Sequence, residues 1–396
     1  MPIVTGTQNA NVRAANTVMS RAFFTRAKKW LYPNLSGSYV STSLVEPHAV
    51  IGNVPPLEQF TGLLRSRMLP SFRQDVPNLL YKNALRIRQS QFEGDQTGAL
   101  VQLSQNMGLT VAEFPDRLLC TRILTGSLAS SATVVFDEDG QTYNLTLDGQ
   151  PFFADAHTTW AAQTQSNNIQ GTLPLTKALL TADDYATNAN KMIRDLQNVL
   201  DTIKNVRDNQ GQPIYPTIDT KESIVIVVPP ILEPIAALAF RTSQEAVINQ
   251  TTSVAPMFIK GVMSSGYLAG FVGPESNNAD VLPVNATDWY VFIVDDYVKP
   301  FYTQLYRPPK DSELMPPGYD AGSEVERILS QNDGISVDQA TVFASTRVDT
   351  TFRRIGAEAD QATIESESFL MSARYRGNIT YGPWFTGYRI KPVGGS

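Results

Sequence analysis

The stretch that most constrains this chain lies shortly before its C-terminus, from Ser372 to Ile390. Its first part alternates apolar and charged residues, which is the pattern of a strand with one buried face. Gly377-Asn378 then interrupts the alternation as a turn pair would. Large aromatic residues follow this pair, namely Tyr381, Trp384, Phe385 and Tyr388. We therefore expect two strands that turn at Gly377-Asn378 and whose aromatic face closes the core of a domain.

The composition of the 396 residues indicates two or three domains with much of their surface against other protein. Charged residues make up only 18% of the chain, below the roughly 25% of an ordinary soluble domain. The net charge of −6 argues against nucleic-acid binding by the chain as a whole. The first 45 residues nevertheless carry +5 and the remainder −11. The cations of this N-terminal arm are Arg13, Arg21, Arg26, Lys28 and Lys29.

A helical pattern, with cations between its apolar residues, runs from about Asn11 to Leu31. Such a basic amphipathic helix is able to lie on a membrane, on nucleic acid or on another subunit. An acid-free arm that contains arginines is also typical of a mitochondrial targeting peptide, which we keep as an alternative. We expect an arm that is solvated or covered by a partner.

Residues 66–93 predict a two-stranded hairpin, with one arm from Met68 to Val76 and the other from Leu79 to Glu93. The second arm alternates with a period of two. From Arg65 onward, the whole hairpin region contains six basic residues, which are Arg65, Arg67, Arg73, Lys82, Arg86 and Arg88. A hairpin with so little core of its own is marginally stable in isolation. We therefore expect it to lie on the body of the chain or on a neighbour.

A long helix is predicted over residues 97–128, because apolar residues recur at intervals of three and four. Pro115 should kink this helix or divide it in two. The next clear pattern is a hairpin within residues 132–147, whose turn is Asp139-Gly140.

An α/β domain is predicted over residues 175–330. A strongly amphipathic helix follows Thr181. A buried strand at 224–228 leads through two prolines into a helix over 231–240. Two further strands are expected at 289–294 and 301–306.

No pattern in the chain indicates catalysis or a bound cofactor. Cys120, the only cysteine, excludes an internal disulfide and a CxxC metal site. Neither His48 nor His157 has carboxylates at a helical ligand spacing, so we expect no metal. Walker A, GxGxxG, GxSxG and HExxH patterns are absent from the sequence, and prolines interrupt the longest apolar run before it could span a membrane. Asp155 and His157 remain the one acid–base pair to consider, and they lack a third partner.

Several short segments resemble, in the same order, those of the major head protein of bacteriophage Mu and its prophage relatives. Gly149 to His157 is similar to a Gly-Gln-Tyr-Phe-Phe-Asp-x-x-His run of that family but is one residue shorter. The other matching segments are Gln91-Phe92-Glu93, Val227–Glu233, Trp289–Phe292, Lys299-Pro300-Phe301 and Arg374-x-Arg376-Gly377-Asn378 followed by Trp384.

The resemblance implies an HK97-like capsid fold of the α+β class. In that fold, residues 1–55 would be an N-terminal arm, and 56–95 an extended loop called the E-loop. A peripheral domain would cover 96–174 and contain a spine helix over 97–128. An axial domain would span 175–330, and 331–396 would return to the peripheral domain with the C-terminal strands.

The resemblance also implies a structural protein, without catalytic residues, cofactor, metal or membrane, in the capsid of a phage virion assembled in the host bacterial cytoplasm. It would form hexamers and pentamers of an icosahedral head around double-stranded DNA, with a portal, a separate scaffold and decoration proteins as partners. We expect subunit-interface residues at Arg73, Lys82, Arg86, Arg88, Arg374 and Arg376. The arm cations would face DNA or scaffold. Alternatives are a phage tail or tube protein, and a small-oligomer α/β enzyme that uses Asp155 and His157.

Overall fold

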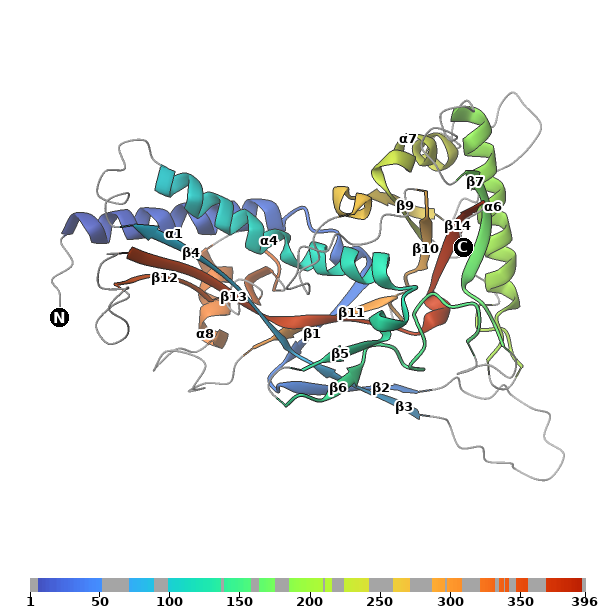
Figure 1. Cartoon of the computed structure of the whole chain (residues 1–396), viewed down its shortest axis with the longest axis horizontal. Helices are drawn as coiled ribbons and strands as arrows, with labels where there is room; N and C mark the ends of the chain where they lie inside the picture. Colours follow the sequence, from blue (N-terminus) through green and yellow to red (C-terminus); the bar gives the residue numbers. More distant parts are fainter. Residues whose placement is uncertain are drawn as a thin grey trace.

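The protein is elongated, with long helices and long strands at one end and a second sheet at the other (Figure 1). Helices and strands are mixed without regular alternation, so the fold is of the α+β class, as predicted. The computed structural model describes residues 6–51, 71–88, 99–136, 139–157, 164–174, 185–208, 211–215, 224–241, 259–270, 287–295, 298–307, 321–331, 335–337, 339–341, 347–354 and 368–393.

The first sheet has five strands and is built around the long strand β13 (Ser368–Tyr381). β4 (Leu79–Arg88) and β12 (Arg347–Arg354) pair with the N-terminal part of β13. The C-terminal part of β13 pairs with β11 (Phe301–Tyr306), and β1 (Ser36–Ser41) adds to β11 in parallel.

Two parallel helices pack against the first sheet (Figure 1). α4 (Ala99–Thr125) is the predicted long helix, and Pro115 lies inside it without ending it, so the predicted division does not occur. α1 (Gly6–Ala27) lies along α4. A Cβ atom on Gly108 would meet the carbonyl oxygen of Met19, so the two backbones approach at this glycine.

The second sheet also has five strands, in the order β7 (Asn168–Pro174), β14 (Gly387–Val393), β10 (Trp289–Ile293), β8 (Ile224–Val228) and β9 (Ile259–Ser264). Every residue of β8 and of β10 is buried, as their continuous apolar sequences predict. The amphipathic helix α6 (Tyr185–Asn205) buries its apolar stripe in the same core, which confirms that prediction. β11, which we expected in the same α/β domain as β10, instead lies in the first sheet.

The C-terminal strands do not form the predicted hairpin. β13 runs straight through Gly377-Asn378, because a Cβ atom on Gly377 would meet the carbonyl oxygen of Gln304 and because Asn378 is bonded inside the fold. The Asn378 side chain donates to the carbonyl oxygen of Pro77 at 3.0 Å and accepts from Arg122 at 2.9 Å.

The chain turns later, at the 3-10 helix η8 (Trp384–Thr386). β14 then enters the second sheet beside β10, so the two C-terminal strands join different sheets instead of both returning to the first. The aromatic residues Tyr381, Trp384, Phe385 and Tyr388 are buried, so this segment does close the core, as predicted.

The predicted hairpin over residues 66–93 is also wrong. β3 (Ser71–Pro77) pairs with β2 (Val45–Ile51), whereas β4 pairs with β13. Asn78 separates the two strands: its backbone N–H donates to Leu44 at 2.7 Å, and its side chain donates to Ser43 at 2.7 Å. These bonds direct β3 and β4 into different sheets. Met68 and Glu93, which were the predicted ends of this hairpin, lie outside the described residues.

Shorter elements complete the fold. β5 (Thr133–Val135) and β6 (Thr142–Asn144) form the predicted hairpin, with Gly140 at a φ of 66° in its turn. The helix expected at 231–240 occurs as three consecutive pieces: the 3-10 helix η3 (Pro230–Leu232), α7 (Glu233–Ala236) and the π-helix η4 (Ala237–Arg241). The remaining elements are α2 (Tyr32–Leu35), η1 (Ala129–Ala132), η7 (Gly266–Ala269) and α8 (Ala321–Gln331).

Candidate interaction surface

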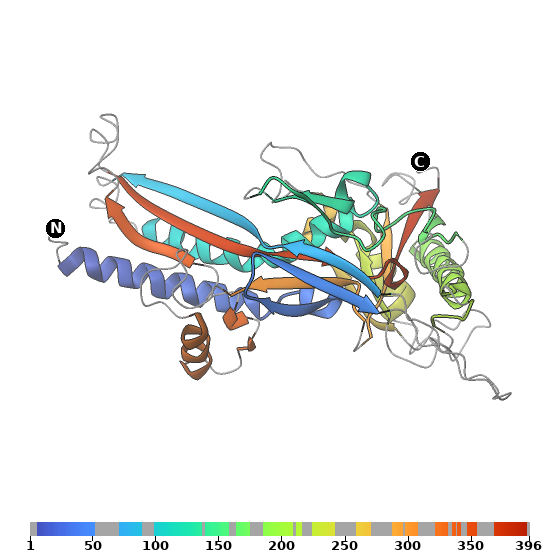
Figure 2. The same ribbon diagram turned by 90° about the horizontal axis from the view of Figure 1, so that it is seen from below.

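One face of the first sheet packs against α4, and several lysine and arginine residues occupy positions on the opposite face. Tyr81 of β4 and Tyr375 of β13 pack against Phe114 of α4, with ring centroids 4.7 and 4.8 Å apart. Because side chains alternate along a strand, Lys82 belongs to the opposite face, and it is exposed. Figure 2 shows this opposite face of β4, β13 and β12 with no described element across it.

The strand register places several basic residues on this opposite face, because residues paired across a sheet share a face. Arg374 lies opposite Lys82 on one side and opposite Arg347 on the other. Leu370 likewise lies opposite both Arg86 and Arg353. We call this surface the basic sheet face; its cations are Lys82, Arg86, Arg88, Arg347, Arg353 and Arg374, and Asp349 is paired there with Ser372.

Sequence reasoning missed Arg347 and Arg353. They lie in a segment whose overall composition is acidic, which hid them. The signal was present, since Arg347 and Arg353 belong to a run of alternating character, but only the register with β13 assigns their positions to the same face of the sheet as Lys82.

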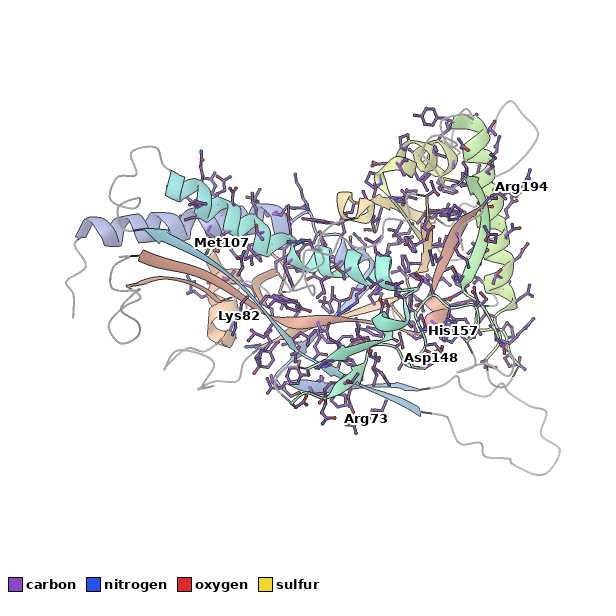
Figure 3. The ribbon with its side chains drawn as sticks, in the orientation of Figure 1. Arg73, Lys82, Met107, Asp148, His157 and Arg194 are labelled. Atoms are coloured by element: carbon purple, nitrogen blue, oxygen red, sulfur yellow. The ribbon has the colours of Figure 1, made fainter. Side chains whose placement is uncertain are left out.

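Two of the expected interface residues are not part of the exposed basic sheet face. Arg376 follows Arg374 by two residues on β13 and so shares its side of the sheet, but it is buried, and its guanidinium carbon lies 5.4 Å above the ring of Tyr306. Arg73 is exposed on β3, in the separate two-stranded sheet, and pairs with Asp75 at 2.8 Å. Figure 3 shows Arg73 and Lys82 on their different strands.

The cations of the N-terminal arm lie on a helix that is docked on its own chain. Met19 and Phe23 are buried against α4, which excludes a fully solvated arm for this part of α1. Arg26 pairs with Glu113 of α4 at 3.0 Å. Arg21, Lys28 and Lys29 are exposed, and the side chain of Arg13 lies outside the described residues.

His157 and Asp155 do not form a pair. The imidazole Nδ1 atom of His157 lies 2.7 Å from Oδ2 of Asp148, and both side chains are buried (Figure 3). Asp155 is exposed instead and lies 3.7 Å from the ammonium group of Lys391. In the part of the chain that the structure describes, no group of three His, Cys, Asp or Glu residues is placed to hold a metal ion.

Asn167 explains the orientation of the buried histidine. Its side-chain amide donates to the carbonyl oxygens of Phe152, Trp384 and Gly387 at 2.7, 3.0 and 2.9 Å. Its Oδ1 atom therefore faces the backbone N–H of Ala154 at 2.9 Å and Nε2 of His157 at 3.2 Å. Asn167 and Asp148 bond to backbone groups, and the His157 ring bonds to these two side chains, so the described contacts of the cluster are all within the fold.

Among the described residues, no helix is both long and apolar enough to cross a bilayer.

Residues 10–196 match the model of a protein family described as the Mu-like prophage major head subunit gpT. This range includes most of α1 and the whole of β4 and α4. No curated protein sequence matches the chain.

Solved phage capsids are similar to this fold. The capsid of the cyanophage P-SCSP1u aligns with 92% of this chain and 88% of its own, at 9% identity and a TM-score of 0.50. The capsid of bacteriophage JBD30 aligns with 60% of this chain and 90% of its own, at 14% identity and a TM-score of 0.43. The mature capsid of bacteriophage PhiM1 aligns with 92% and 88%, at 10% identity and a TM-score of 0.44. The likeness to the cyanophage capsid shows that the fold is HK97-like.

Proposed function

We propose that this chain, which is similar over residues 10–196 to the Mu-like prophage head subunits, is a major capsid protein that assembles with copies of itself into the hexamers and pentamers of an icosahedral shell that encloses double-stranded DNA. The family match is the observation that carries the proposal. The basic sheet face supports it, because the surface is charged, continuous over three strands and not covered by any element that the structure describes.

The division of the chain follows the two sheets. We assign the first sheet with α1 and the spine helix α4 to the peripheral domain, and the second sheet with α6 to the axial domain. The E-loop would be based on β2 and β3, since these strands pair with each other, which moves it toward the N-terminus from the predicted 56–95. The predicted arm over 1–55 would then comprise the docked helix α1 and the strands that lead into the E-loop.

The basic sheet face would contact a neighbouring copy of the chain. It carries six cations and one acid, while the chain as a whole has a net charge of −6, so the remaining surface of a second copy is acidic and complementary. Contacts between two different surfaces of identical subunits close into rings, as the five- and six-membered capsomers of a shell require.

The exposed arm cations Arg21, Lys28 and Lys29 would face a separate scaffold or the phosphates of packaged DNA, without sequence preference. Portal and decoration proteins would complete the virion capsid, assembled in the host cytoplasm. We assign the chain a structural role without catalysis, because the buried His157 is paired with Asp148 and Asn167, and Asn167 in turn holds the backbone.

Electron microscopy of the purified chain, expressed with and without its co-encoded proteins, tests the assembly. We expect closed shells with five- and six-fold capsomers. Stacks of six-fold rings without five-fold vertices would indicate a tail or tube protein instead. Discrete small oligomers under all conditions would overturn the proposal.

Charge reversal tests the basic sheet face. We expect the double substitution Arg86→Glu with Arg88→Glu to abolish shells while leaving a folded subunit. The matched control is Arg194→Glu with Lys204→Glu, which reverses two exposed cations on α6. Equal shell yields from the wild type and the Arg86/Arg88 variant would place the subunit contacts elsewhere.

A further inference from the structure

The joint that follows α1 is held by backbone contacts to α4 on both sides of Pro115. The indole N–H of Trp30 donates to the carbonyl oxygen of Ala112 at 2.5 Å. The next two backbone N–H groups, of Leu31 and Tyr32, both donate to Oδ1 of Asp116, at 2.9 and 3.0 Å. The end of the N-terminal helix therefore depends on one carboxylate of the spine helix.

Asp116 is an unusual place for a negative charge. Its exposed fraction is 1%, and its Oδ2 atom is buried without a hydrogen-bond partner among the described residues. The ionisable groups around it are Arg26 on α1, and Glu113 and the Cys120 thiol on α4. Arg26 pairs with Glu113 at 3.0 Å, so its charge is already compensated. A buried carboxylate in this position is costly when ionised.

Burial raises the pKa of Asp116 from 3.8 to about 6, although the two backbone N–H groups and Arg26 act in the opposite direction. When the joint lifts away from α4, Asp116 meets water and its pKa falls back toward the ordinary value. The docked state therefore binds a proton more tightly than the released state.

We propose that Asp116 and the two backbone N–H groups form a protonation-dependent anchor that holds the N-terminal helix α1 on the spine helix α4. Docking is strongest below the ordinary pKa of an aspartate, weakens as the pH rises through about 6, and changes little above neutrality. The anchor gives the subunit a means to change the mobility of its arm without any change in its sheets. This inference goes beyond the assembly role and does not depend on it.

Hydrogen exchange of the full-length chain measures the anchor directly. Protection of the amides of residues 17–31 is expressed as the ratio to the intrinsic exchange rate at each pH, and α4 amides serve as the internal reference for global unfolding. We expect the relative protection of α1 to fall about tenfold between pH 5 and pH 7 in the wild type. We expect little further change from pH 7 to pH 8.

The Asp116→Asn variant removes the charge and keeps the Oδ1 acceptor for Leu31 and Tyr32. Its α1 protection should be independent of pH and, at pH 8, higher than that of the wild type. The matched control Asp201→Asn, at an exposed aspartate of α6, should behave as the wild type. If the α1 protection of the wild type does not change with pH, the proposed anchor is wrong, and this test requires no variant. The proposal is also wrong if the α1 protection of Asp116→Asn still changes with pH.

Discussion

The imidazole ring of His157 lies flat against the indole ring of Trp384, with ring centroids 4.6 Å apart and planes 2° from parallel. This stack lies where the chain passes from β13 in the first sheet to β14 in the second. Asp148 holds the other edge of the imidazole at 2.7 Å. The loop that contains His157, which sequence analysis considered as a weak catalytic candidate, therefore stabilises the segment that connects the two sheets.

Asn167→Ala should destabilise the subunit by about 2–4 kcal/mol, because a buried amide that serves several backbone partners is removed and leaves them unsatisfied. Three carbonyl oxygens and the backbone N–H of Ala154 lose their partner. Urea unfolding of the unassembled subunit measures the change. The control Asn190→Ala, on the exposed side of α6, should change stability by less than about 0.5 kcal/mol. Equal midpoints for the two variants would show that the crossover does not depend on Asn167.

Gly108→Val should displace α1 from α4, because any Cβ atom at this position meets the carbonyl oxygen of Met19. We expect trypsin to cleave within α1 at least tenfold faster than in the wild type, since docked helices resist proteolysis. Gly261→Val is the control, because a Cβ atom there has nothing within 4 Å. Unchanged cleavage of the Gly108 variant would contradict the close approach of the two helices.

Arg376 and Lys82 were both expected at a subunit interface, but substituting them should have different effects on the stability of the isolated subunit. Arg376→Met removes a buried cation stacked on Tyr306 and should lower the stability of the isolated subunit by roughly 2 kcal/mol. Lys82→Met removes an exposed cation and should leave that stability within about 0.5 kcal/mol. Thermal unfolding of unassembled subunits compares them. If only Lys82→Met lowered the stability, the assignment of Arg376 to the interior and of Lys82 to the exposed surface would be wrong.

Cys120 should not react with iodoacetamide at pH 8 while the subunit is folded. Burial raises the pKa of its thiol to about 12, so the reactive thiolate is scarce, and the sulfur is also inaccessible. Mass spectrometry should show alkylation only after denaturation. Rapid labelling of the native subunit would show that this part of α4 opens.

The sequence predicted a helix or a hairpin correctly where a single segment has its own periodicity or turn signal. The recurrence of apolar residues from Leu100 to Leu118 predicted α4, and Asp139-Gly140 predicted the β5–β6 hairpin. In both cases, the hydrogen bonds that form the element join residues close together in the chain, so a local pattern is sufficient.

The partners of the long strands were decided only by the tertiary structure. The sequence of β3 and β4 is compatible with a hairpin, yet their partners are β2 and β13, and β14 joins β10. The candidate surface depends on the same long-range register, since Arg353 and Arg86 share a face only because both lie opposite Leu370. Sequence by itself determined the segments with a strong periodicity or a continuous apolar run of their own, such as α4, α6 and β8, and which residues are apolar or basic. Only packing selected the pairings, because a strand offers the same backbone hydrogen bonds to any partner, and burial of the side chains chooses among them.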